Sequence, residues 1–407
     1  MSKFEYPAIL EKIDKWWSGI IGAVMVPLIS FILQGWQNIN IVIAIIIGVV
    51  AGVLIHYTWD NFIWSRPESP FGRENEVNRL ISKIRTGQSG VVIGAFGEEK
   101  TQILQYLRDK TYLNHTERKR LIFSFIDLST WDRQSQRSGF WRAVLEPLNE
   151  ISVIKQDYEA CKSQDFTRVS VENLLGAMYR NKIRLILIMD RFHEIIHFNH
   201  LSQPEFLANL RSLAPSRNPS PLCLIVTSKE SLLKLHKALM LMKNVTTSPY
   251  FNFMNDDEVI LGILAEGKAD TFIKKYKFSE TENNTIKKIA GYHPYLLKLM
   301  LNSLREAHAA REDEPLAIAK QSFICRIKEL FENLSTNWSE KTCLTFVAVA
   351  QQKARELSGF EDELKELEKQ GLIYKSKDGM WQVSSPAFSE ILKDKQMTEI
   401  CKPKQQV

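Results

Sequence analysis

Four short, continuous runs of apolar residues constrain this chain most strongly. Runs without polar alternation suit strands that are buried on both faces, as in a parallel sheet. Helical patterns separate the runs, and this alternation predicts an α/β fold with helices on both faces of the sheet. The predicted strands are residues 91–94, 121–126, 184–189 and 222–227, with a fifth at 249–253. The predicted helices are residues 101–110, 139–150, 170–181 and 203–213.

The pattern changes after the predicted sheet. An acidic segment, Asn255-Asp256-Asp257-Glu258, has the composition of a helix start, and the pattern stays helical to about Leu334. A helix at 360–370 then precedes two short strands at 372–375 and 380–384, joined by a turn that contains Asp378 and Gly379. These patterns predict a helical lid followed by a winged helix.

The N-terminal part contains no Asp, Glu, Lys or Arg in the 44 residues from Trp16 to Trp59. That length suits two bilayer-spanning helices, placed at about 18–36 and 41–59. Lysines precede the first span and arginines follow the second, so the positive-inside rule predicts an integral membrane protein with both termini in the cytoplasm. A cleavable signal peptide fits less well because the apolar region is too long. The lipid bilayer is therefore an expected partner.

These patterns divide the chain into five expected regions. They are a membrane anchor at 1–65, a P-loop-like α/β domain at 66–254, a helical lid at 255–334, a winged helix at 335–395 and a basic tail at 396–407. The five cysteines show no metal-ligand spacing, and in a cytoplasmic body they are expected to be reduced thiols.

A phosphate-binding motif lies between the first predicted strand and the next helix. In the pattern GxxxxGKT, backbone N–H groups surround the phosphates, Lys reaches the terminal phosphates and Thr holds magnesium. Glu99 replaces the second glycine, so the loop has either lost the nucleotide or holds it with this carboxylate turned away. The segment reads Gly94-Ala95-Phe96-Gly97-Glu98-Glu99-Lys100-Thr101.

A second motif is the apolar strand that ends in Asp190. An acid at this position coordinates magnesium together with the loop threonine, Thr101. ATPases that polarise water carry a further acid next to it, but this chain has Arg191. Glu194 is the remaining candidate for a catalytic acid, at unfavourable spacing. The pattern predicts weak or no hydrolysis, and Asp190 as a plain turn-capping residue is the alternative.

Two further segments make the pattern resemble the STAND-type branch of the AAA+ P-loop ATPases. Phe71-Gly72-Arg73-Glu74 resembles the GRE box of that family, and Gly291-Tyr292-His293-Pro294 resembles its GxP motif. The resemblance implies ATP or ADP with Mg²⁺ as the cofactor. It places Phe71, Arg73 and Pro294 at the base, Gly94, Gly97, Lys100 and Thr101 at the phosphates, Asp190 and Thr101 at the metal, and Thr227 at the sensor position.

The resemblance implies a switch that nucleotide holds in a closed form. The predicted function is a membrane-anchored, nucleotide-binding signalling or defence protein, which forms homo-oligomers and contacts a protein partner through its lid or winged helix. Three alternatives stay open: a pseudo-ATPase scaffold that has lost nucleotide, an active membrane ATPase, and a DNA-binding ATPase akin to origin-recognition proteins.

Two other features of the sequence concern nucleic-acid binding and metal binding. The helix at 360–369 carries five acids and two lysines, a net charge of −3, which argues against nucleic acid as a partner. His193, His197 and His200 cluster after Asp190, and His193 and His197 are spaced i, i+4. No third ligand lies at suitable spacing, so these histidines are expected to be packing or solvated side chains rather than a metal site.

Overall fold

The computed structural model describes residues 70, 72–110, 112–214, 220–243, 251, 258–336, 338–353, 359–393 and 401. The chain divides into two compact units, Met1–Pro67 and Glu68–Val407, and the described residues belong to the second. The two expected membrane spans and Phe71, expected at the base, lie outside the described residues.

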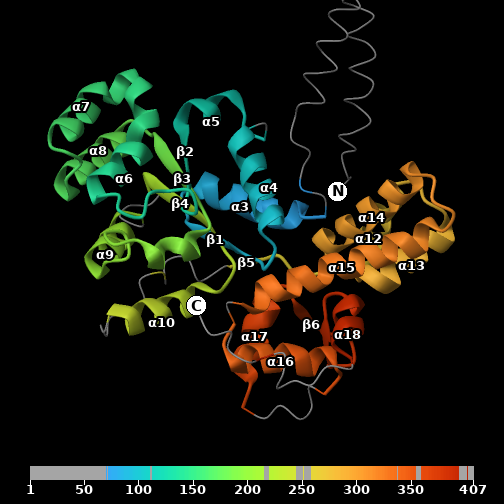
Figure 1. Cartoon of the computed structure of the whole chain (residues 1–407). Coiled ribbons are helices and arrows are strands. Elements are labelled where there is room, and N and C mark those ends of the chain that lie inside the picture. The colour runs from blue at the N-terminus through green and yellow to red at the C-terminus, as the bar shows by residue number, and fades with distance from the viewer. Residues whose placement is uncertain are drawn as a thin grey trace, which may run out of the picture. The chain divides into compact units, whose positions relative to one another are not determined.

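A parallel sheet of five strands forms the centre of the first part of this unit (Figure 1). Its strand order is β2-β3-β4-β1-β5, and every pairing in it is parallel. The predicted α/β class is confirmed, and four predicted strands agree with the structure to within one residue at each end. The strands are β1 (Gly90–Ile93), β2 (Leu121–Asp127), β3 (Arg184–Asp190), β4 (Leu222–Ser228) and β5 (Val259–Ile260).

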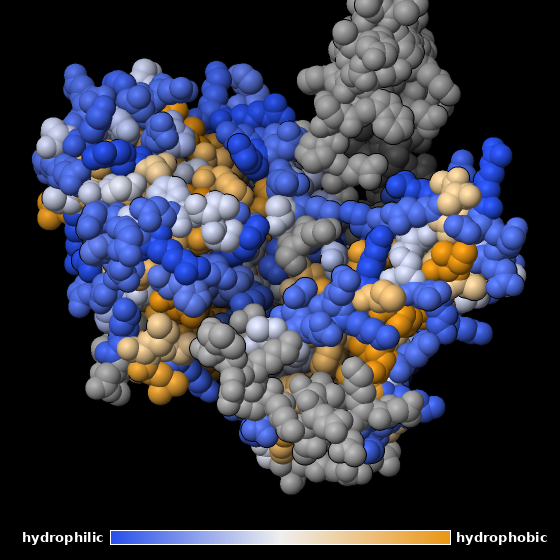
Figure 2. Space-filling view, in the orientation of Figure 1, coloured by the Kyte–Doolittle hydropathy of each residue, from blue (hydrophilic) through white to orange (hydrophobic). Residues whose placement is uncertain are grey.

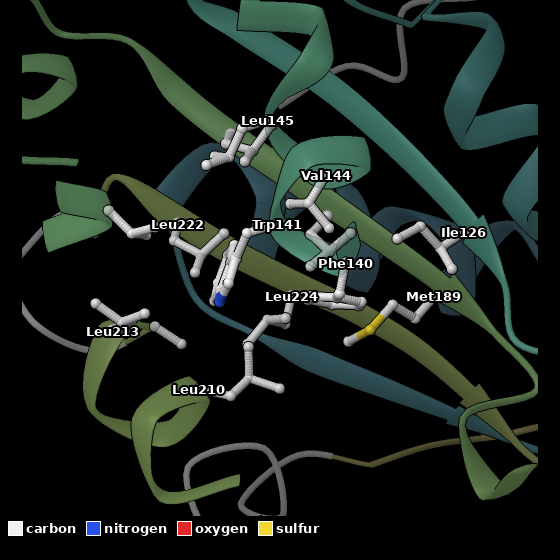
Figure 3. Close-up of a cluster of buried hydrophobic side chains, with 14 of the residues drawn as sticks. Ile126, Phe140, Trp141, Val144, Leu145, Met189, Leu210, Leu213, Leu222 and Leu224 are labelled. Carbon is white, nitrogen blue, oxygen red and sulfur yellow. The ribbon is translucent and has the colours of Figure 1, made fainter. Parts of the chain in front are cut away.

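Helices cover both faces of this sheet, because successive strand residues enter different cores. In β3, Leu185, Leu187 and Met189 pack on one side, whereas Ile186 and Ile188 pack on the other. Figure 3 shows the first core, where side chains of α6, among them Phe140 and Trp141, meet residues of β3 and β4. The helices and 3₁₀ turns here are α3 (Glu74–Thr86), α4 (Gly97–Asp109), α5 (His115–Arg120), α6 (Arg137–Leu145), η1 (Glu146–Glu150), η2 (Ser152–Ile154), α7 (Lys155–Ser163), α8 (Arg168–Arg180), η3 (Phe192–His197), α9 (Pro204–Leu213) and α10 (Leu232–Lys243).

A separate hydrophobic core holds the rest of the unit together. Phe323, Phe346 and Phe388 are fully buried in it and come from three different helices. The elements are α12 (Glu266–Lys274), α13 (Glu280–Ala290), α14 (Pro294–Ala309), α15 (Pro315–Ser335), α16 (Glu340–Ala350), α17 (Glu361–Lys369), β6 (Ile373–Lys375), β7 (Trp381–Val383) and α18 (Pro386–Leu392). The antiparallel pair β6–β7 follows α17, which is the element order that the winged-helix prediction requires. That these elements form a lid and a winged helix stays a prediction.

The fifth strand differs from its prediction. It was expected at 249–253, but the structure places β5 at Val259–Ile260, directly after the acidic segment that was expected to start a helix. The two-residue strand pairs with Val92 and Ile93 of β1, and Leu261 donates a hydrogen bond to the Ile93 carbonyl oxygen at 2.8 Å. Such a short edge strand has too few residues to show an apolar run.

The expected localisation in a membrane is corrected by the structure. Among the residues that it describes, no helix is long and apolar enough to cross a bilayer. The longest of these helices, α15, has 21 residues but carries Lys320, Arg326 and Lys328 among its charged side chains. Charges at these positions would be costly in the hydrocarbon region.

The expectation of five free thiols is wrong for one pair. Cys343 of α16 and Cys401 form a disulfide, with their Cα atoms 5.7 Å apart. The two residues are 58 positions apart in the sequence, so no spacing pattern indicates the pairing. Cys161 and Cys223 are buried free cysteines and Cys325 is an exposed one.

Candidate functional site

The phosphate loop connects the carboxyl end of β1 to the start of α4. Its backbone is held from both sides: Gly94 N–H donates to the Ser228 carbonyl oxygen at 3.2 Å, and Ala95 N–H donates to that of Gln370 at 2.8 Å. The first of these partners ends β4, whereas the second follows α17. The loop is therefore built on the sheet and is bonded directly to the C-terminal part of the unit.

Phe96, at the N-cap of α4, anchors the loop in the second hydrophobic core. Its ring is buried and stacks on Tyr295, with ring centroids 4.8 Å apart, and it meets the edge of His293 at 4.5 Å. Both partners lie at the start of α14: His293 belongs to the segment that resembles the GxP motif, and Tyr295 directly follows that segment. Loop and helical region therefore share one packed contact.

Lys100 is folded over the loop, where a phosphate-binding lysine would be needed. Its ammonium donates to the carbonyl oxygens of Gly94 and Phe96, the latter at 3.1 Å. Burial lowers the pKa of Lys100 to about 8, although the carboxylates of Asp190 and Glu99 oppose this shift. A buried ammonium held only by neutral carbonyls, with carboxylates nearby, is prepared to receive an anion.

Asp190 is the centre of the second half of the site. Thr101, in the first turn of α4, donates its hydroxyl to Asp190 Oδ2 at 3.0 Å, and the Thr227 hydroxyl donates to Oδ1. The backbone N–H of Arg191 donates to Oδ1 at 2.9 Å. The structure thus brings together Lys100, Thr101, Asp190 and Thr227. A carboxylate beside a hydroxyl is an oxygen donor set that Mg²⁺ accepts, with phosphate oxygens and water completing the shell.

Glu99 points away from this cluster, into a buried ionic group of its own. Its Oε1 accepts from Arg73 Nε at 2.6 Å, and its Oε2 lies 3.7 Å from His293 Nε2. Burial raises the pKa of Glu99, against the charges of Arg73 and Lys100, and burial holds the pKa of His293 well below its ordinary value. Arg73 also donates to the Gly262 carbonyl oxygen at 2.5 Å. This guanidinium is therefore occupied by protein groups.

A cavity of about 580 Å³ lies over the loop and the end of β3. Its charged lining residues are Lys100, Arg191, Lys229 and Asp190, so its net charge is positive, as a polyphosphate requires. Lys229, His193, Gln102 and Gln105 were not predicted as site residues. The two glutamines follow Lys100 in α4 by two and five residues, and Lys229 follows β4. Lys229 could have been found as a neighbour of a predicted strand end. The lining consists of Ala95, Lys100, Thr101, Gln102, Gln105, Asp190, Arg191, His193 and Lys229.

Asp190 is the only carboxylate among the described residues that line this cavity. Arg191 has a left-handed backbone, and its guanidinium lies 3.5 Å from Asp127. Glu194 instead faces two histidines, 3.5 Å from His193 Nε2 and 3.9 Å from His197 Nε2. The predicted catalytic candidate thus lies outside the cavity lining.

The remaining predicted residues lie beside the cavity rather than in its lining. Gly97 is the first residue of α4, and Pro294 is the first of α14, buried next to Phe96 and His293. The described residues hold no group of three or more His, Cys, Asp or Glu side chains that could bind a metal ion. His193 lines the cavity with 8% of its surface exposed, and burial and the cations of Lys229, Lys100 and Arg191 lower its pKa to about 3.

Comparison with known proteins identifies the fold. No protein-family description and no curated protein matches the chain. A Walker-type ATPase of Pyrococcus abyssi superposes with a TM-score of 0.53 at 14% identity, covering 79% of this chain and 95% of that one. The ORC2 protein of Aeropyrum pernix, in ADPNP–ADP complexes, gives 0.48 at 11% identity over 82% and 94%. The ORC1 protein of that organism, in complex with DNA, gives 0.38 at 11% over 80% and 93%. The first likeness shows that the described chain has the fold of a P-loop ATPase.

Proposed function

We propose that this protein is a nucleotide-binding switch that holds ATP or ADP with Mg²⁺ and hydrolyses it slowly or not at all. One observation carries the proposal: Lys100, Thr101 and Asp190 line one cationic cavity, in which no second carboxylate among the described residues is present. These residues supply the groups that a P-loop site needs to bind phosphate, whereas the described lining offers no further acid to activate water.

Binding rests on charge and on oxygen donors. Lys100 and the backbone of the first turn of α4 would hold the β- and γ-phosphates, since the N-terminal end of a helix attracts anions. Thr101 and Asp190 would hold Mg²⁺, which supplies charge neutralisation when it is bound. Lys229 and Arg191 add positive charge to the cavity lining. Glu99 does not oppose phosphate there, because its carboxylate is bonded to Arg73.

Slow turnover follows from the chemistry around Asp190. A hydrolytic site needs a group that accepts a proton from, or orients, the attacking water. The residue in that place is Arg191, which cannot accept a proton, and Glu194 is turned toward His193 and His197. Bound nucleotide would therefore persist, as a switch requires.

The switching element would be the contact between the loop and the helical region. Phe96 stacks on Tyr295, and Glu99 lies between Arg73 and His293, so a change in the loop backbone alters contacts of α14 directly. The resemblance to STAND-type ATPases supports this arrangement, with a protein partner that binds the helical or C-terminal part and a homo-oligomer as the active form.

A second candidate is a scaffold that has lost nucleotide. The specific observation in its favour is that Arg73, expected at the base, is already occupied by Glu99, Glu76 and the Gly262 carbonyl oxygen. In that case the loop would serve only to hold the sheet and the helical region together.

The test is binding of ATP and ADP, with and without Mg²⁺, to the full-length protein by calorimetry. Wild type is expected to bind, and Lys100→Ala is expected to weaken binding about tenfold or more, because it removes a charge-assisted hydrogen bond. Lys237→Ala, an exposed lysine of α10, is the matched control and should bind as wild type does. Failure of wild type to bind, with recovery in Glu99→Gly, would establish the scaffold instead. Steady ATP turnover that Asp190→Asn abolishes would establish an active ATPase.

A further inference from the structure

A second cavity, of about 680 Å³, lies on the described part of the chain away from the phosphate loop. It touches Leu121 and Arg184, the first residues of β2 and β3, and Ser220 and Pro221, which precede β4. The strands are parallel, and the phosphate loop follows the carboxyl end of β1. The cavity therefore lies at the opposite edge of the same sheet, beside α5 and the end of α8 (Figure 1).

The lining of this cavity is strongly basic. Five of its residues are cationic and one, Glu117, is acidic, so its formal charge is 5 − 1 = +4. The α5 segment adds two further cations, Arg118 and Lys119, and Figure 2 shows mostly hydrophilic residues over α5. The cationic lining residues are Arg85, Arg120, Arg180, Lys182 and Arg184.

Two of these cations form hydrogen bonds within the protein. Arg85 Nε donates to Glu117 at 2.8 Å. Arg184 closes the end of α3, since it donates to the carbonyl oxygens of Ile84 at 2.8 Å and Ser220 at 2.9 Å. These bonds satisfy the last carbonyl groups of the helix and fix the wall of the cavity.

The side chains of the other three cations, Arg120, Arg180 and Lys182, form no hydrogen bond or ion pair with the described residues. All three side chains are exposed. They come from the end of α5 and from the turn between α8 and β3, two segments that are far apart in the sequence. Convergence of unpaired like charges on one cavity is unfavourable unless an anion neutralises them.

The backbone conformation of Lys182 is a further unusual feature of this cavity. Its φ is +56°, in the left-handed region that favours glycine at such a helix end. Ile183 N–H donates to the Met178 carbonyl oxygen at 2.9 Å, which closes the turn in the usual manner of a helix C-terminus. A lysine here keeps a strained backbone and places its charge at the cavity, where glycine would fit the turn better.

The uncharged lining is mostly apolar and aromatic, with Thr116 and Ser220 as its polar members. Leu121, Ile183 and Pro221 are buried and form the apolar part, and Tyr179 is 38% exposed beside them. An aromatic ring stacks well on tyrosine and on arginine guanidinium groups. The volume is within the range of small-ligand sites, which is roughly 300–1,000 Å³.

We propose that this cavity binds a nucleotide-class ligand, with its ring on the apolar and aromatic lining and its phosphate at Arg120, Arg180 and Lys182. The same chemistry has two sources, a free mononucleotide or the end of a nucleic-acid strand. This site is independent of the phosphate loop, which lies at the other edge of the sheet.

The test uses AMP, which lacks the β-phosphate that Lys100 would hold, titrated into the full-length protein by calorimetry. Wild type is expected to bind AMP, and each removed cation should weaken binding about threefold to tenfold. The variants are Arg120→Ala, Arg180→Ala and Lys182→Gly. The last also relieves the backbone, so the fold is retained. Lys277→Gly is the matched control, since Lys277 is an exposed lysine with φ +57° outside the cavity.

The possible outcomes distinguish binding at this cavity from binding at the phosphate loop. AMP binding that survives Lys100→Ala, falls in the three cavity variants and is unchanged in Lys277→Gly supports the site. Loss of AMP binding in Lys100→Ala alone would assign it to the phosphate loop and overturn the inference, as would absence of AMP binding in wild type. A short single-stranded oligonucleotide that binds more tightly than AMP, with the same dependence on Lys182, would identify a strand as the source. None of these results depends on whether ATP binds at Lys100.

Discussion

Glu99 shows how one residue can change the role of a whole loop. In the phosphate-binding pattern its position belongs to glycine, and a carboxylate turned inward would repel phosphate. In the structure the Glu99 carboxylate points away from the cavity. Its Oε1 lies 2.6 Å from Arg73 Nε, and both side chains are almost fully buried. The loop therefore gains a buried ion pair without losing Lys100 or Thr101 from the cavity.

The buried pair of Arg73 and Glu99 should couple strongly in a double-mutant cycle. Removing one partner leaves the other charge buried and uncompensated, so Glu99→Gln and Arg73→Met should each lower the free energy of unfolding by about 2 kcal/mol or more. The double variant should lose less than the sum, with a coupling of at least about 1 kcal/mol, measured by urea unfolding.

Arg168 and Glu172 provide the control for that cycle. Their Nε–Oε1 distance is 2.9 Å, but both side chains are about half exposed. Solvent screens this pair, so its coupling should be at most about 0.5 kcal/mol. Equal coupling in the two pairs would show that burial of the Arg73–Glu99 pair has no energetic consequence.

His193 should make the protein less stable in acid. The unfolded chain takes up a proton at histidine near pH 6.5, whereas burial and nearby cations lower the pKa of folded His193 to about 3. Between these values the unfolded state binds more protons, so the free energy of unfolding should fall as the pH drops below about 6.5, by up to about 1.4 kcal/mol per pH unit.

His193→Asn isolates this contribution. The asparagine oxygen can replace Nδ1 as acceptor of the Lys229 N–H, which lies at 3.3 Å, but it does not titrate. Urea unfolding at pH 7 and pH 5 should show a smaller acid loss in this variant than in wild type. His197→Asn, at a half-exposed residue of the same 3₁₀ turn, should retain the wild-type loss. An identical pH dependence in wild type and His193→Asn would contradict the assignment.

At the scale of elements, the predictable parts were those with a strong local pattern. The strands β1, β3 and β4 are almost entirely buried, and β2 is partly buried, and their ends agree with the sequence because the apolar run stops where the strand leaves the core. Lys100, Thr101 and Asp190 were predictable for the same reason, since each follows a recognisable strand.

The parts that could not be predicted depend on contacts between distant segments. The two residues of β5 carry no periodic signal, and the outward turn of Glu99 depends on Arg73, 26 residues away. The Cys343–Cys401 disulfide likewise becomes visible only when the elements are assembled. Spacing in the sequence therefore predicted residues that line the cavity over the loop, but not the groups that connect the loop to the helical region.

Phe96 connects the phosphate loop to the start of α14, so its replacement should lower the stability of the protein. Phe96 occupies the N-cap position of α4, and its ring is buried against Tyr295 and His293. Phe96→Ala should lower the free energy of unfolding by about 3 kcal/mol, because it leaves a cavity and removes the ring contacts. Phe96→Leu keeps most of the volume and should lose about half as much. Thermal unfolding measures both, and equal losses would show that the volume lost at this position has no effect.

At the scale of the whole unit, α17 and the residue that follows it are docked at several points against the α/β part of the unit. The Gln370 carbonyl oxygen accepts from Ala95 of the phosphate loop, Glu366 accepts from Ser231 N–H at 2.9 Å, and Lys369 pairs with Glu258 at 2.6 Å. Gly371, with φ +75°, makes this approach possible, because an added Cβ would lie 2.2 Å from the Leu261 carbonyl oxygen.

Gly371→Ala should therefore separate α17 from the phosphate loop, whereas Gly379→Ala should not. Gly379 has a similar φ of +77° but nothing within 4 Å of an added Cβ, so its variant carries only the cost of the left-handed backbone, about 1 kcal/mol. Hydrogen exchange at Ala95 should speed up in Gly371→Ala and remain near wild type in Gly379→Ala, since the bond to Gln370 is lost only in the first. If both variants leave exchange at Ala95 unchanged, the loop is not held by the C-terminal part. Faster exchange together with a changed ADP affinity in Gly371→Ala alone would show that this docking contact and the nucleotide site form one switch.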